Sequence, residues 1–137
     1  MRYVLVDTDV VSLLMRGSPD AEQFKPHLVD RIPAIAFVTV GELYFGGYNA
    51  GWGDRRMASI EQSIRRYVVL PYDDNLAKMW GRQRAKAKAA GSALYQPENT
   101  NDLWIATCSI YYEAPLLTNN RRHFTDLEDL SLADERN

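Results

Sequence analysis

The chain opens with the feature that most constrains its fold, an apolar run from Tyr3 to Val6 that ends in the acidic turn Asp7-Thr8-Asp9. The run lacks the alternation of a strand with one exposed face, so it predicts a strand buried on both faces, as in a parallel sheet covered by helices. Ligands of open α/β sheets bind at the carboxyl ends of the strands, where the loops lie outside the packed core. The carboxylates that follow this strand are therefore the first candidates for a functional site.

The rest of the chain alternates helical patterns with short apolar strands. Further strands are expected at residues 34–38, 67–70 and 114–118, and the acidic tail offers an edge strand near residues 130–132. Helical spacing is found between them, at about residues 9–16, 18–28, 39–48, 57–64, 74–90 and 99–112. Strands separated by helices imply right-handed crossovers and a parallel sheet. We therefore expect an α/β fold in which residues 1–137 form a single domain.

Composition excludes several other classes of protein. The chain has 137 residues, of which 46% are hydrophobic and 25% charged, and its apolar runs fall far short of the ~20 residues of a membrane span. The acidic residues Asp7 and Asp9 come too early in the chain for the apolar stretch of a secretory signal. We therefore expect a cytoplasmic protein without membrane contact. The single cysteine, Cys108, excludes an intrachain disulfide and a cysteine-rich zinc site.

Three acids follow or precede strands that could be neighbours in the sheet. Asp7 follows the first strand, Glu42 lies one turn into the helix after the second, and Asp102 lies one turn into the helix before the last. If these strands are adjacent, the three carboxylates meet at one edge and repel one another unless a cation is bound. Oxygen ligands of this kind suit Mg²⁺ or Mn²⁺, which can activate water for attack on a phosphodiester.

Each of these acids also has a simpler interpretation. Asp9 could cap the helix that follows it, and Glu42 could pair with Thr39 in a capping box. Asp102 could interact favourably with a helix dipole from the first turn. For Glu42 and Asp102 taken alone, the simpler interpretation is favoured. A purely structural role is harder to assign to Asp7, because a carboxylate directly after a strand buried on both faces is costly to desolvate without a partner.

The sequence contains four segments that resemble, in order, the four sequence blocks of the PIN-domain nucleases: VLVDTDVVSLL, VTVGELYFG, NDLWIATCSI and APLLTNNRRHF. The resemblance is greatest to the VapC-type toxins of bacterial toxin–antitoxin pairs. It implies a three-layer α/β/α sandwich with a central parallel sheet, and an Mg²⁺- or Mn²⁺-dependent endoribonuclease that is the toxin of a type II system. It also implies a homodimer, a small VapB-type antitoxin as partner, and Asp7, Glu42 and Asp102 as the catalytic, metal-binding acids.

One departure from the family pattern concerns the last core strand. Many PIN domains have a fourth acid directly after it, where this chain has Thr118-Asn119-Asn120. An amide can contact a metal but supplies no charge. We therefore expect one well-held metal rather than two, with Thr8, Thr118 and Asn119 orienting carboxylates and waters. Asp126 or Glu128 could replace the missing acid.

Two surfaces could contact partners. Arg121 and Arg122, or the basic run from Lys78 to Lys88, could contact RNA phosphates, although a solvated helix surface is the favoured interpretation of that run. An aromatic set could form an apolar groove for the antitoxin, a dimer patch or part of the core. This set comprises Tyr44, Phe45, Tyr48 and Trp52.

Two other functions compete with the nuclease. A catalytically silent PIN-like module would bind nucleic acid or a partner without cleaving, which is compatible with the missing fourth acid. The opening Asp7-Thr8-Asp9 also resembles the first motif of haloacid dehalogenase-type phosphatases, but that mechanism leaves Glu42 and Asp102 without a role. The nuclease is therefore the preferred hypothesis.

Overall fold

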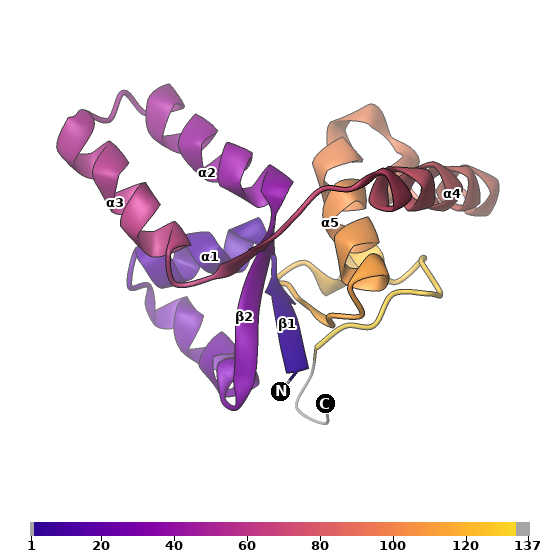
Figure 1. Ribbon diagram of the computed structural model, residues 1–137, viewed down its shortest axis with the longest axis horizontal. Helices are drawn as coiled ribbons and strands as arrows, with labels where there is room; N and C mark the ends of the chain where they lie inside the picture. The colour runs from indigo at the N-terminus through magenta and orange to yellow at the C-terminus, as the bar shows by residue number, and fades with distance from the viewer. Residues whose placement is uncertain (1, 134–137) are drawn as a thin grey trace.

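A four-stranded parallel sheet forms the centre of the computed structural model, which describes residues 2–133 (Figure 1). The strands are β1 (Arg2–Val6), β2 (Arg31–Ala36), β3 (Val68–Leu70) and β4 (Leu116–Leu117), in the order β3-β2-β1-β4. Strand β1 pairs with β2 on one side and with β4 on the other. The strands whose ends carry the candidate acids are therefore neighbours.

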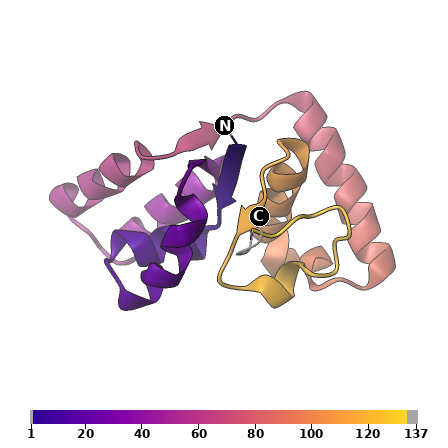
Figure 2. The same cartoon turned by 90° about the horizontal axis from the view of Figure 1, so that it is seen from below.

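Helices cover both faces of this sheet. Figures 1 and 2 show α1 (Thr8–Met15), α2 (Phe37–Asn49) and α3 (Asp54–Ile64) on one side, and α4 (Asp74–Ala90) and α5 (Thr100–Tyr111) on the other. Four 3₁₀ segments complete the described chain: η1 (Pro19–Leu28), η2 (Ala93–Tyr95), η3 (Pro97–Asn99) and η4 (Arg121–Phe124). The three-layer α/β/α sandwich is confirmed.

The apolar run of β1 contributes to two separate cores. Val4 and Val6 pack in the cluster beneath α1, α2 and α3, whereas Leu5 packs in the cluster beneath α4 and α5. All three side chains are fully buried. The absence of alternation in the sequence thus reflects burial on both faces, as the parallel sheet requires.

The second strand begins and ends earlier than the sequence indicates, and so the helix after it also begins earlier. Phe37 and Val38 are the first residues of α2 rather than the end of a strand. Both pack against the core under α4 and α5, and Phe37 meets Trp104 edge-on with ring centroids 5.4 Å apart. Tertiary packing therefore overrides the strand propensity of an apolar run.

Smaller differences concern the ends of elements. The helix expected at residues 18–28 is the 3₁₀ segment η1 (Pro19–Leu28), which contains Pro26. The expected edge strand is reduced to one parallel bridge between Leu116 and Leu132. Ser18 and Asp73 cap η1 and α4, since their side chains accept hydrogen bonds from the backbone N–H groups of Asp20 and Leu76. None of the helices in residues 2–133 combines the length and apolar character that a membrane crossing requires.

Candidate active site

The carboxyl edge of the sheet contains a polar cleft of about 340 Å³ beside the ends of β1 and β4. Four carboxylates line it: Asp7, Asp9, Glu42 and Asp102. The start of α1 contributes the first two, α2 the third and the start of α5 the fourth. Parallel pairing of β1 with its neighbours brings these helix starts to one edge, although the acids are far apart in the sequence.

Asp7 is the most deeply buried of the four acids, with only 5% of its surface exposed. It caps α1, since its Oδ1 accepts a hydrogen bond from the Thr8 backbone N–H at 2.8 Å. Its Oδ2 accepts one from the Thr118 hydroxyl at 2.7 Å. Burial raises the pKa of the Asp7 carboxyl from 3.8 to about 7, and the charges of Asp9 and Asp102 act in the same direction. The two hydrogen bonds oppose this rise and fix both oxygens in place.

Asp9 does not cap the helix, so the capping interpretation of this residue is wrong. Asp7 occupies the cap position, and Asp9 lies in the first turn of α1 with its side chain in the cleft. Its Oδ1 lies 3.5 Å from the backbone nitrogen of Asn119, which donates to it. Burial raises the pKa of Asp9, and the charge of Glu42 adds to the rise. A fourth acid therefore lines the cleft, contributed by α1 rather than by the end of β4.

Glu42 is held by a threonine rather than by a capping box. Its Oε1 accepts a hydrogen bond from the Thr8 hydroxyl at 2.7 Å, and the Thr8 and Thr39 hydroxyl oxygens are 2.9 Å apart. Since Thr8 donates its single hydroxyl hydrogen to Glu42, Thr39 must donate to Thr8. The helix begins at Phe37 with Ala36 at its cap, so the predicted capping box between Thr39 and Glu42 is wrong.

Asp102 has a neighbour that the sequence does not single out, His123. The His123 Nδ1 lies 3.0 Å from Asp102 Oδ2, without the alignment of a hydrogen bond. Burial raises the pKa of Asp102, as do the charges of Glu42 and Asp9, while His123 opposes the rise. The only signal for His123 is its place in the fourth sequence block, five residues after Thr118.

The residues expected to support the acids contribute in different ways. Thr8 and Thr118 bind carboxylates through their hydroxyls. Asn119 meets Asp9 only through its backbone N–H, whereas the neighbouring Asn120 lines the cleft. Neither amide adds charge, so the negative charge of the cleft comes from the four carboxylates.

Several of the basic and aromatic residues are already engaged in the fold. Lys86 pairs with Asp129 at 2.6 Å, and the Arg84 guanidinium lies 4.5 Å above the Tyr95 ring. Arg121 donates to the Ala133 carbonyl at 2.9 Å. Of the aromatic set, Phe45 and Tyr48 are exposed, while Tyr44 and Trp52 pack against the core beneath α1, α2 and α3.

The chemistry of the cleft suits a hard cation. Burial and mutual repulsion raise the pKa values of Asp7, Asp9 and Asp102, and a cation would offset this excess of negative charge. In residues 2–133, no three Asp, Glu, His or Cys side chains are arranged so that they could hold one metal ion together. Mg²⁺ typically keeps several waters and is bound by one or two carboxylates, which this cleft can supply.

Comparisons with known proteins cover almost the whole chain. Residues 4–130 match the family model of the PIN domain. The chain is 29% identical to "Ribonuclease VapC1" of Haemophilus influenzae over 136 residues, which cover 98% of each protein. It is 32% identical to "Ribonuclease VapC5" of Mycobacterium tuberculosis over 117 residues, or 83% of this chain and 80% of the relative. The structure of VapBC-1 from nontypeable Haemophilus influenzae superposes with a TM-score of 0.79 at 27% identity, with 100% of both chains covered.

Proposed function

Because this chain belongs to the PIN-domain family and is a ribonuclease toxin of the VapC type, we propose that its acidic cleft is the site of RNA cleavage. The observation that carries this proposal is that Asp7, Glu42 and Asp102 line one cleft at the carboxyl edge of the sheet. Family membership makes the phosphatase alternative wrong. The similarity to ribonucleases over nearly the whole chain favours an active enzyme over a silent binding module.

PIN-domain ribonucleases are in general metal-dependent, and the cation we propose here is Mg²⁺ or Mn²⁺. Asp7 and Asp102 would hold it, and Glu42 would complete the shell or position a water. A cation bound there would polarise the phosphodiester and lower the pKa of the attacking water. The chain's own contribution is orientation: Thr118 and the Thr8 N–H hold the two oxygens of Asp7, and the Thr8 hydroxyl holds Glu42.

Asp9 supplies the charge that the end of β4 lacks. Its carboxylate lines the cleft and accepts from the backbone of Asn119, at the position where related nucleases often have an acid. We therefore assign Asp9 to the site as its fourth carboxylate. Since Asp126 and Glu128 do not line the cleft, Asp9 is the better candidate for this role.

The partners follow from the type of toxin. The superposable structure is a VapBC complex, which supports a VapB-type antitoxin as the partner that neutralises this chain. RNA is the substrate, and a cytoplasmic site of action suits an enzyme that meets RNA and its antitoxin there. Assembly as a homodimer is part of the same proposal.

A cleavage assay on a panel of structured RNAs tests the proposed site. Cleavage should occur with Mg²⁺ or Mn²⁺, stop with EDTA, and fall by at least about 100-fold in Asp7→Asn, which keeps the size of the side chain but removes its charge. The exposed Asp126→Asn is the matched control and should cleave normally. Cleavage that survives both EDTA and Asp7→Asn would reject the assignment, and metal binding without cleavage of any RNA would favour the silent module.

A further inference from the structure

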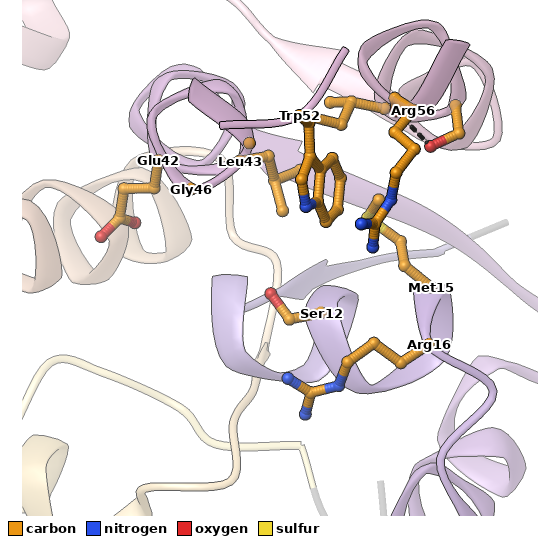
Figure 3. Close-up of a pocket in the computed structure, with 11 residues that line it drawn as sticks. Ser12, Met15, Arg16, Glu42, Leu43, Gly46, Trp52 and Arg56 are labelled. Atoms are coloured by element: carbon orange, nitrogen blue, oxygen red, sulfur yellow. Dashed lines mark hydrogen bonds between the residues drawn. The ribbon is translucent and has the colours of Figure 1, made fainter. Parts of the chain in front are cut away.

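A second hollow opens directly beside the acidic cleft, between α1, α2 and α3 (Figure 3). It measures about 440 Å³, and Ser12 and Glu42 line both it and the cleft. In Figure 3 the Trp52 ring projects into this groove beside Leu43, and Glu42, which also lines the cleft, stands at one end of it. An RNA chain bound in the cleft can therefore extend along the surface into the groove.

Two arginines face this groove from opposite walls. Arg16 follows α1 and Arg56 lies on α3, and both side chains are exposed (Figure 3). Neither forms an ion pair with a carboxylate within residues 2–133, whereas Arg65, also at α3, binds Glu61 at 2.9 Å. The Arg56 guanidinium lies 4.3 Å above the Trp52 ring. The groove thus combines two available guanidinium groups, which suit phosphate oxygens, with an aromatic and aliphatic floor.

We propose that this groove binds the single-stranded RNA segment on one side of the scissile bond, an assignment that rests on the proposed nuclease function. Arg16 and Arg56 contact backbone phosphates, and a base packs against Trp52. Single-stranded nucleic acid is bound elsewhere by the same combination of cations along the backbone and aromatic rings under the bases.

The Trp52 ring favours RNA over an acidic peptide as the occupant, because an acidic peptide has no base to pack against it, and the charges of the groove suit a polyanion. The cleft next to the groove carries four carboxylates, which repel a polyanion unless cations flank them. Arg16 and Arg56 are the cations at this flank, because the groove opens into the cleft at Ser12 and Glu42. In the basic run on α4, two of the five side chains are already engaged, since Lys86 is paired with Asp129 and Arg84 donates to the Tyr95 carbonyl.

The proposal is tested by the binding of a short unpaired RNA oligonucleotide to the intact chain in EDTA, measured by fluorescence anisotropy over a range of salt concentrations. Arg16→Gln and Arg56→Gln should each weaken binding by about three- to tenfold at 0.1 M salt. Each should also reduce the slope of log K against log[salt] by about 0.7, the value for one lost phosphate contact on a single strand. Arg65→Gln is the matched control, because Arg65 is paired with Glu61 and does not line the groove. It should change neither the affinity nor the salt slope.

Trp52→Leu tests the base contact. It should weaken binding by about tenfold and reduce the salt slope less than either arginine variant does, although Arg56 loses the ring on which it lies. Because Trp52 also packs against the core, thermal unfolding must show that this variant is folded. Arg16→Gln and Arg56→Gln variants that bind RNA like the unsubstituted chain would overturn the proposal, whatever the result for Trp52.

Two further measurements distinguish the ways in which the proposal can fail. Cleavage by the arginine variants should show a raised KM with kcat nearly unchanged, whereas Asp7→Asn should lose kcat. Normal cleavage by Asp7→Asn would reject the catalytic site while leaving the groove intact. If the arginine variants lose affinity for a poly-glutamate peptide but not for RNA, the groove is a site for acidic peptides and the RNA proposal is wrong.

Discussion

The Asp7 side chain combines two properties that oppose each other, the charge that the proposed metal site requires and an environment that disfavours charge. Burial, reinforced by Asp9 and Asp102, raises its pKa from 3.8 to about 7. A raised pKa in the folded state means that the folded protein binds a proton more tightly than the unfolded chain does. The neutral form therefore stabilises the fold below pH 3.8, and this contribution is lost as the pH rises towards 7.

We accordingly predict that Asp7→Asn stabilises the metal-free protein at pH 8 but much less at pH 5. The gain in the free energy of unfolding at pH 8 has an upper limit of roughly 4 kcal/mol, since each pKa unit corresponds to about 1.36 kcal/mol. Urea unfolding in EDTA at both pH values measures the difference, with Asp126→Asn as the exposed control. A variant that is equally stable or less stable than the unsubstituted chain at both pH values would contradict the strained environment inferred for Asp7.

Residues of the site differ in how far the sequence predicts them. Asp7, Glu42 and Asp102 are accessible to sequence reasoning because each follows or opens a recognisable element, and strand adjacency then brings them together. For Asp9 the sequence leaves a cap and a site residue as alternatives, because local capping rules do not reveal that Asp7 already occupies the cap. His123 has only its place in the fourth sequence block as a signal, since its contact with Asp102 depends on the path of η4, which carries no periodic pattern.

At the scale of elements, the link between α1 and α2 organises the site. Thr8 opens α1 and Thr39 lies in the first turn of α2, and their hydroxyls meet at 2.9 Å where Thr8 also holds Glu42. The sequence pattern Thr39 to Glu42 has capping-box spacing, but the helix starts two residues earlier because Phe37 and Val38 pack on the opposite core. Local spacing could not indicate this, because the partner of Thr39 is distant in the chain.

We predict that Thr8→Val destabilises the protein by about 1–3 kcal/mol, because it leaves the fully buried Thr39 hydroxyl without its acceptor. Cleavage should fall as well, since Glu42 loses the hydrogen bond that orients it. Thr8→Ser keeps the hydroxyl and should restore both stability and most of the activity. Chemical denaturation and RNA cleavage measured on the same preparations would test this, and failure of serine to restore cleavage would indicate that the threonine methyl group, not the hydroxyl, matters.

At the scale of the whole molecule, the layered architecture separates stability from function. The two cores lie beneath the helical layers on the two faces of the sheet, and the cleft lies at the sheet edge, where α1, α2 and α5 begin. The alternation of apolar strands with helical patterns predicts the parallel sheet and its helical layers. The strand order comes from the structure, in which β1 pairs with both β2 and β4. The groove between α1, α2 and α3 is harder to predict, because its walls depend on how far apart three helices pack.

Because four partly buried carboxylates share one cleft, a bound cation should stabilise the whole molecule. With free Mn²⁺ at 100 times its dissociation constant, the folded state should gain about 2.7 kcal/mol by mass action, which corresponds to a rise in Tm of several degrees. Calorimetric titration should show one equivalent bound at pH 8. Asp102→Asn should lose most of this stabilisation, whereas Asp126→Asn should keep it. An equal Tm in Mn²⁺ and in EDTA for the unsubstituted chain would show that the cleft does not hold the metal tightly, and the charge balance proposed for Asp7, Asp9, Glu42 and Asp102 would then be wrong.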